Sequence, residues 1–355
     1  DPGLYKYGIE KGLINLDNWI LQGGMEPGFL YLMALLNILF STQALLIWVF
    51  ILFNILLGLS IYITTKELSN KEAGLIALLI FTLSLVQFKT FWYLYYKNII
   101  GLTIMLFAIF FLTKYEKSNK SSNLIIFTIL GGLILHIHRP TFYIFGLSFL
   151  IYSFISPYRI NNKSYNYKSL KKNIISGIVI ILIGLLPYLR KFSQAITSIL
   201  PFVAEGFISP GESPGTFISF FTYTFSILFY LPLALIGLIY FIKKKELNFI
   251  IIWFIINLII VYFQFFFFNR FIIHLDIAMI ILSGIGAVIL IESNKKLTFS
   301  ILIILILSGG IAAYNEASNS KPLISQETLD LIEKIDLITE ENASIMSFSS
   351  EYSPW

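Results

Sequence analysis

The sequence contains no cysteine, only three histidines and few charged residues. Disulfide bonds and thiolate metal sites are therefore excluded, although the absence of cysteine does not identify a compartment. Charged residues make up 13% of the chain, about half of the roughly 25% that soluble domains carry. Hydrophobic residues make up 57% of the 355 residues, and the mean hydropathy is +0.81. This composition predicts an integral membrane protein.

The net charge of +5 is small for so long a chain. The basic residues lie in short loops between apolar runs, where they act as topology signals. We therefore expect membrane lipids among the partners and no nucleic acid.

Ten apolar segments have lengths near that of a membrane span. Crossing ~30 Å of hydrocarbon takes ~20 helical residues, and fewer where a helix is buried in a bundle. The predicted fold class is an all-α transmembrane helical bundle. A shorter stretch, Gly28–Phe40, predicts an interfacial or re-entrant helix. The predicted spans are 44–63, 73–88, 98–114, 123–136, 140–156, 173–189, 216–241, 247–267, 271–291 and 298–315.

The distribution of basic residues predicts the orientation. Loops after the odd-numbered spans hold 15 of the 25 lysines and arginines, which places these loops in the cytoplasm. Both ends of the sequence are then external, in a multi-pass protein of the plasma or cytoplasmic membrane. We expect three parts: an external catalytic loop at 1–28, a bundle at 29–315, and the start of an external soluble domain at 316–355. A further helix is expected before Asp1.

Residues able to carry chemistry gather at the predicted outer surface. Two carboxylates, Asp1 and Glu26, lie in the N-terminal stretch. All three histidines lie in outer turns or one turn below them, together with isolated basic residues that the positive-inside rule does not explain. The candidate binding residues are Tyr5, Lys97, His136, His138, Arg139 and Arg270.

This set of groups suits glycosyl transfer from a polyprenyl-phosphate donor. A carboxylate deprotonates the acceptor hydroxyl as it attacks the anomeric carbon. The leaving lipid phosphate gains negative charge, which arginine, lysine or histidine at the membrane boundary stabilises. The active cleft is expected on the external side of the bundle.

Structural interpretations compete with this hypothesis. Arg139 and Arg270 could reach lipid headgroups. The pair His136 and His138 could belong to a zinc site or to an ordinary interfacial turn. An ionisable group within a span usually has a partner, so Asp276 could be a counter-ion that holds Arg270.

The pattern resembles the GT-C superfamily of multi-pass membrane glycosyltransferases. The resemblance lies in Asp1-Pro2-Gly3-Leu4-Tyr5, in Glu26-Pro27-Gly28-Phe29-Leu30-Tyr31, and in the stretch that Asn269-Arg270-Phe271 opens. It implies an inverting hexosyl- or pentosyltransferase that uses a lipid-phosphate sugar, with a lipid, glycan or protein acceptor. Asp1 is implied as the catalytic base, with Glu26 second. The sequence identifies no cofactor, and it leaves open whether a divalent metal assists the reaction.

Two alternatives remain open. Polysaccharide polymerases of the EpsG and Wzy type share an acidic-aromatic first loop and a basic residue before a span, here Lys97. A membrane transporter or flippase would have broken helices at corresponding places in two halves and ionisable groups near mid-membrane.

Overall fold

The computed structural model describes residues 9, 26–159, 164–191, 219–265, 268–319 and 326–338. Most of these residues form helices, which turns and short connections join, and a small antiparallel hairpin consists of β1 (Tyr158–Arg159) and β2 (Ser164–Tyr165). The predicted all-α class is confirmed. The helices are α2 (Pro27–Asn37), α3 (Thr42–Ala44), the π-helical η1 (Leu45–Val49), α4 (Phe50–Leu68), α5 (Lys71–Leu83), α6 (Leu85–Trp92), α7 (Tyr96–Ser118), α8 (Ser121–Ile137), α9 (Arg139–Ile155), α10 (Tyr167–Leu185), the 3₁₀-helical η3 (Leu186–Lys191), α12 (Phe220–Ile227), α13 (Leu231–Lys244), α14 (Phe249–Tyr262), α15 (Phe268–Ser293), α16 (Lys295–Asn319) and α17 (Gln326–Ile338).

Each predicted span corresponds to a helix or to a pair of helices. Five helices in the described ranges are long and apolar enough to cross a membrane, or up to seven if each bent pair counts as one span. The helices α8, α9 and α14 have 17, 17 and 14 residues and fall below that length. The count of ten passes therefore stays a prediction. The short apolar stretch at Gly28–Phe40 is helical as α2, which ends at Asn37.

Two of the predicted spans are divided by sharp bends. The span at 73–88 consists of α5 and α6, which meet at 58°, and the span at 216–241 contains α12 and α13, which meet at 77°. The first bend occurs at Ser84, whose backbone is extended (φ −69°, ψ 117°). Its hydroxyl accepts a hydrogen bond from the backbone N–H of Gln87 (3.3 Å) and so caps α6.

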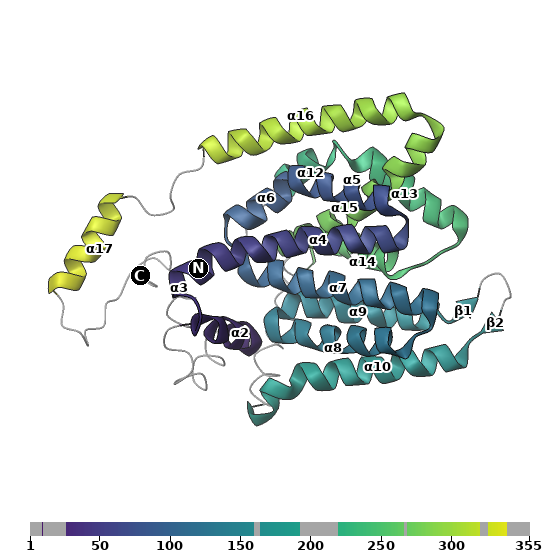
Figure 1. Ribbon diagram of the computed structural model, residues 1–355, viewed down its shortest axis with the longest axis horizontal. Coiled ribbons are helices and arrows are strands. Elements are labelled where there is room, and N and C mark those ends of the chain that lie inside the picture. The colour runs from purple at the N-terminus through teal and green to yellow at the C-terminus, as the bar shows by residue number, and fades with distance from the viewer. Residues whose placement is uncertain are drawn as a thin grey trace.

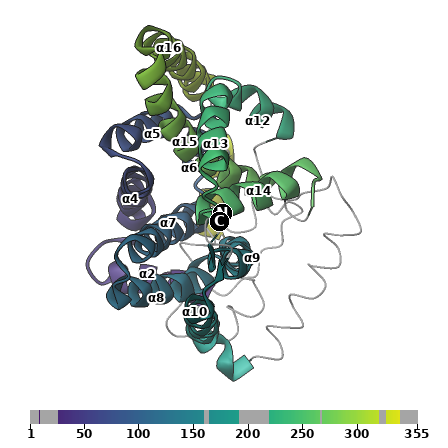
Figure 2. The same cartoon turned by 90° about the vertical axis from the view of Figure 1, so that its right-hand side faces the viewer.

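The helices form a bundle around α15. Figure 1 shows α4, α7, α8, α9 and α10 running side by side, with α16 along one edge. Figure 2 looks nearly along these helices: α5, α13 and α16 lie around α15 in its upper part, and α7 to α10 form the lower part. Within α15, 94% of the most apolar stretch is buried. Gly286 allows α13 to pack closely, because a Cβ there would overlap the carbonyl oxygen of Leu233.

The C-terminal helix α17 occupies Gln326–Ile338, where the sequence predicts an amphipathic helix. Figure 1 shows it away from the bundle. The soluble domain that this helix would begin stays a prediction.

Candidate functional site

The turn between α8 and α9 carries the first part of the site. The helix α8 ends at Ile137, His138 is extended (φ −154°, ψ 104°), and α9 begins at Arg139. Pro140 lies in the first turn of α9, where a missing N–H costs nothing and a fixed φ favours the helix. The turn is thus short and rigid, and it presents His138 and Arg139 at the start of α9.

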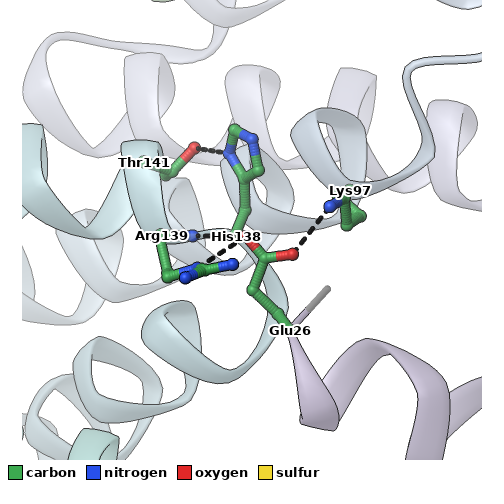
Figure 3. A network of polar contacts seen from close by, with 5 residues as sticks. All are labelled: Glu26, Lys97, His138, Arg139 and Thr141. Atoms are coloured by element: carbon green, nitrogen blue, oxygen red, sulfur yellow. Dashed lines mark hydrogen bonds and ion pairs between the residues drawn. The ribbon is translucent and has the colours of Figure 1, made fainter. Parts of the chain in front are cut away.

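Glu26 joins three helices at this turn. Its carboxylate accepts hydrogen bonds from Nζ of Lys97 on α7 (2.7 Å) and from the backbone N–H of Arg139 on α9 (3.1 Å). The Nε of Arg139 lies 3.6 Å from the same carboxylate. Figure 3 shows Glu26 reaching from the start of α2 between Lys97 and Arg139. The side chain of Glu26 is only 3% exposed, so burial strengthens both ion pairs.

A close approach of α2 to α8 places Glu26 there. Gly28, in the first turn of α2, lies against His136: a Cβ at Gly28 would come within 2.8 Å of the carbonyl oxygen of His136. The sequence Glu26-Pro27-Gly28 therefore has a structural explanation. Proline begins the helix, and glycine lets its first turn touch α8.

His138 is buried and hydrogen-bonded toward the core. Its Nδ1 lies 2.7 Å from Oγ1 of Thr141, and this hydroxyl lies 3.2 Å from Nε2 of His274 on α15. Burial lowers the pKa of His138 well below its ordinary value, and the positive charges of Lys97, Arg270 and Arg139 lower it further, as does His274. His138 is therefore a neutral imidazole at physiological pH.

Three cations thus act electrostatically on His138. We call Lys97, Arg139 and Arg270 the cation cluster. They come from the first turns of three different helices: α7 begins at Tyr96, α9 at Arg139 and α15 at Phe268. Each helix N-terminus carries about half a positive charge and unpaired N–H groups. Neither α7 nor α9 is capped by the side chain of its own N-cap residue. This end of the bundle is thus a strongly positive site, suited to an anion.

The structure brings together most of the predicted residues that it describes. Glu26, Lys97 and Arg139 form one contact network, and the neighbouring His138 bonds to Thr141 (Figure 3). Arg270 acts on His138 electrostatically. His136 lies apart: its Nε2 is 2.8 Å from the carbonyl oxygen of Ile183, at the end of α10. The other two predicted site residues, Asp1 and Tyr5, lie outside the described residues.

The zinc hypothesis gains no support from the described part of the chain. His136 and His138 make hydrogen bonds to different neighbours, on α10 and α9 respectively. Within the described ranges, no three histidine, aspartate or glutamate side chains gather as metal ligands would.

Asp276 does not have the partner that the sequence suggests. Its carboxylate accepts hydrogen bonds from Ser84, Gln87 and Tyr230, three neutral side chains. The expected pairing with Arg270 is disfavoured by distance, because six helical residues separate the two by about 9 Å along the axis.

Sequence analysis also missed Thr141, which links His138 to His274. Its position two residues after Arg139, in the first turn of α9, would have been the available signal.

Comparisons with known proteins agree with the fold. Residues 25–189 match the model of the dolichyl-phosphate-mannose-protein mannosyltransferase family. No curated protein matches the chain. Among solved structures, the Archaeoglobus fulgidus oligosaccharyltransferase tethered with an acceptor peptide is 16% identical, with a TM-score of 0.64 over 96% of this chain and 53% of that one.

Two further oligosaccharyltransferase structures are also similar. The protein of the peptide-tethered structure, in its complex with zinc and sulfate, is 16% identical, with a TM-score of 0.62 over 96% of this chain and 51% of that one. The Archaeoglobus fulgidus oligosaccharyltransferase AglB in complex with an inhibitory peptide and a dolichol-phosphate is 15% identical, with a TM-score of 0.53 over 95% of this chain and 50% of that one. The chain therefore spans about half the length of the solved structures that it matches. At such identities the likeness shows the fold. The family match over residues 25–189 and this fold agree with the resemblance to the GT-C superfamily of membrane glycosyltransferases that the sequence predicts.

Proposed function

We propose that this protein is a membrane glycosyltransferase that moves a sugar from a polyprenyl-phosphate donor to an acceptor at the external face. The observation that carries the proposal is the cation cluster at the N-termini of α7, α9 and α15, where Lys97 and Arg139 converge on Glu26 and Arg270 acts on the adjacent His138. One of the matched structures is a complex with a dolichol-phosphate, and a lipid phosphate is the class of anion that such a cluster suits.

The net charge of the site favours the leaving group over the donor. Three cations and the single carboxylate of Glu26 leave a net charge of +2, since His138 is neutral. A sugar phosphodiester carries one negative charge, whereas the released phosphate monoester approaches two. The site therefore stabilises the charge that develops as the bond breaks, which lowers the barrier to transfer.

The proposed reaction is a single displacement. The acceptor oxygen forms a bond to the anomeric carbon, and its proton passes to a carboxylate. The bond between the anomeric carbon and the phosphate oxygen breaks, and its electron pair stays with the phosphate. Attack opposite the leaving group inverts the anomeric centre, as expected for a hexosyl- or pentosyltransferase that requires one general base.

We propose Asp1 as that base and Glu26 as the alternative. A base must reach the acceptor hydroxyl within hydrogen-bonding distance. Glu26 is buried and held by Lys97 and Arg139, which favours a role in holding the cations in place. The acceptor remains a lipid, a glycan or a protein in this proposal.

The test is transfer of a radiolabelled sugar from its polyprenyl phosphate by the purified full chain. Asp1→Asn should abolish transfer and leave donor binding intact. Arg139→Gln should reduce kcat/KM by roughly 10- to 150-fold, since hydrogen bonds to charged groups contribute ~1.5–3 kcal/mol. Lys243→Gln, a matched control at an exposed position on α13, should match the wild type. Wild-type transfer by both Asp1→Ala and Glu26→Ala would disprove this mechanism.

One observation favours transport as a second candidate. Two predicted spans are broken, and both breaks lie against Asp276, which is within a predicted span. Broken helices and intramembrane ionisable groups are features of many transporters. Both oxygens of Asp276 are, however, occupied by protein donors. Uptake of an added lipid phosphate or sugar into proteoliposomes without any transfer would favour the transporter; transfer by purified protein would favour the enzyme.

A further inference from the structure

The two broken spans meet at one side chain of α15. The break between α5 and α6 is at Ser84, and the break between α12 and α13 ends at Tyr230. Both residues donate hydrogen bonds to Asp276, which is fully buried. Nothing in the proposed chemistry uses this carboxylate, so its role is still to be explained.

The carboxylate accepts from three donors on two sides of α15. Its Oδ2 accepts from Oγ of Ser84 (2.9 Å) and from Nε2 of Gln87 (2.8 Å). Its Oδ1 accepts from the hydroxyl of Tyr230. Three donors converge on two oxygens, which only a carboxylate can satisfy: an amide would turn its own NH₂ group toward at least one donor.

Additional hydrogen bonds hold both breaks against α15. The Nε2 of Gln87 also lies 3.3 Å from the carbonyl oxygen of Ile273, and Oγ of Ser283 lies 3.1 Å from the carbonyl oxygen of Tyr230. The breaks are thus attached to α15 just before and just after Asp276. We call Ser84, Gln87, Tyr230 and Asp276 the helix-break clamp.

The clamp lies on the face of α15 opposite the candidate site. Each helical residue advances about 100° around the axis. Arg270 and His274 are four residues apart and share a face, whereas Asp276 lies two residues after His274, about 200° around the helix. His274 contacts Thr141 on α9. One face of α15 is therefore fixed to the helix breaks, while the other presents Arg270 and His274 to the start of α9, where His138 and Thr141 lie.

We infer that Asp276 is a positioning residue: it fixes the rotation of α15 and so holds Arg270 and His274 beside His138. The inference rests on the proposed function only in that Arg270 binds the lipid phosphate. Asp276 itself contacts no substrate. Its loss should weaken donor binding through Arg270.

The first test is kinetic. Asp276→Asn should raise the KM for the polyprenyl-phosphate sugar about tenfold, with a smaller change in kcat, because it misplaces one phosphate contact. In an Arg270→Gln background, Asp276→Asn should raise the KM further by no more than about twofold. The effects of two residues are not additive when one acts through the other. Tyr223→Phe, which removes a buried hydroxyl that contacts the sulfur of Met279 on α15, is the matched control and should leave KM unchanged.

The second test reports the rotation of α15 without any donor. The chain has no cysteine, so a single cysteine at Asn269, in the first turn of α15, can be labelled with a maleimide. Its labelling rate should change at least severalfold in the Asp276→Asn background. A cysteine at the exposed Gln43 on α3 should label at the same rate in both backgrounds.

The outcomes separate the two proposals. Unchanged labelling at position 269 would overturn the positioning role, as would additive effects of Asp276→Asn and Arg270→Gln on KM. Changed labelling in a protein that transfers no sugar in any form would support the positioning role and reject the proposed function. If Asp276→Asn does not fold, Ser84→Ala and Tyr230→Phe each remove one donor and should shift labelling in the same direction. Ser60→Ala, which removes a buried hydroxyl bonded only within α4, should not.

Discussion

Removal of Glu26 should destabilise the bundle measurably, because its carboxylate is shared by two cations. Lys97 lies 2.7 Å away and Arg139 lies 3.6 Å away, and Glu26 itself is 3% exposed. Breaking a fully buried pair by removing one partner costs ~3–5 kcal/mol. The side chains of Lys97 and Arg139 are 20% and 22% exposed, so water can solvate them after the substitution. We therefore expect Glu26→Ala to lower the free energy of unfolding by about 2 kcal/mol.

A double-mutant cycle isolates the ion pair from other effects of the substitution. Glu26→Ala, Lys97→Met and the double variant would be unfolded reversibly by SDS in mixed micelles, with helicity followed by circular dichroism. The coupling energy between the two positions should be about 1 kcal/mol or more, as for residues in direct contact. Glu26→Gln should cost less than Glu26→Ala, because the amide oxygen still accepts from the backbone N–H of Arg139. Additive effects of the two single variants would show that the pair contributes nothing, and the account of Glu26 as the link between α2, α7 and α9 would be wrong.

Three further predictions concern the same end of the bundle and its orientation. Gly28→Ala should displace α2 from His136 and lower the free energy of unfolding by ~1–3 kcal/mol, measured in the same unfolding assay; an unchanged stability would argue against the close approach. Because the pKa of His138 is lower in the folded protein than in the unfolded chain, the unfolded chain is protonated at a higher pH than the folded one. The free energy of unfolding should therefore fall as the pH drops below about 6.5. His138→Gln should flatten that part of the profile, and an identical slope in this variant would contradict the buried neutral imidazole. For topology, a cysteine at Lys171 should resist an impermeant maleimide added to cells, whereas one at Glu212 should react; the reverse pattern would invert the orientation.

Much of the helical architecture follows from the local sequence. Apolar runs bounded by polar residues predict helices at all ten segments, because apolar length is the main requirement of a membrane helix. The break at Ser84 was missed, since one serine in an apolar run does not interrupt hydropathy. At this break the serine hydroxyl donates a hydrogen bond to Asp276, 192 residues away in the sequence. No local pattern contains such a contact.

The sequence predicts which residues gather at the candidate site better than it predicts which of them contact one another. Scarce charged residues at helix ends pointed to Glu26, Lys97, Arg139 and Arg270, because charge is costly near a membrane and is retained where it acts. Their pairing depends on the packing of α2 against α8, which glycine at position 28 permits and which sequence alone does not reveal. The expected partnership of Asp276 with Arg270 is wrong, because the partners of Asp276 lie on other helices far away in the sequence.

The account depends most on the claim that the cation cluster binds a lipid phosphate. The direct measurement is the affinity of the purified full chain for a polyprenyl phosphate, compared with the corresponding polyprenol, which has the same hydrocarbon chain and no phosphate. We predict that the phosphate binds at least ~10-fold more tightly, and that Arg139→Gln removes most of this preference while the exposed Lys243→Gln retains it. Equal affinities for the phosphate and the alcohol, or an undiminished preference in Arg139→Gln, would contradict the account.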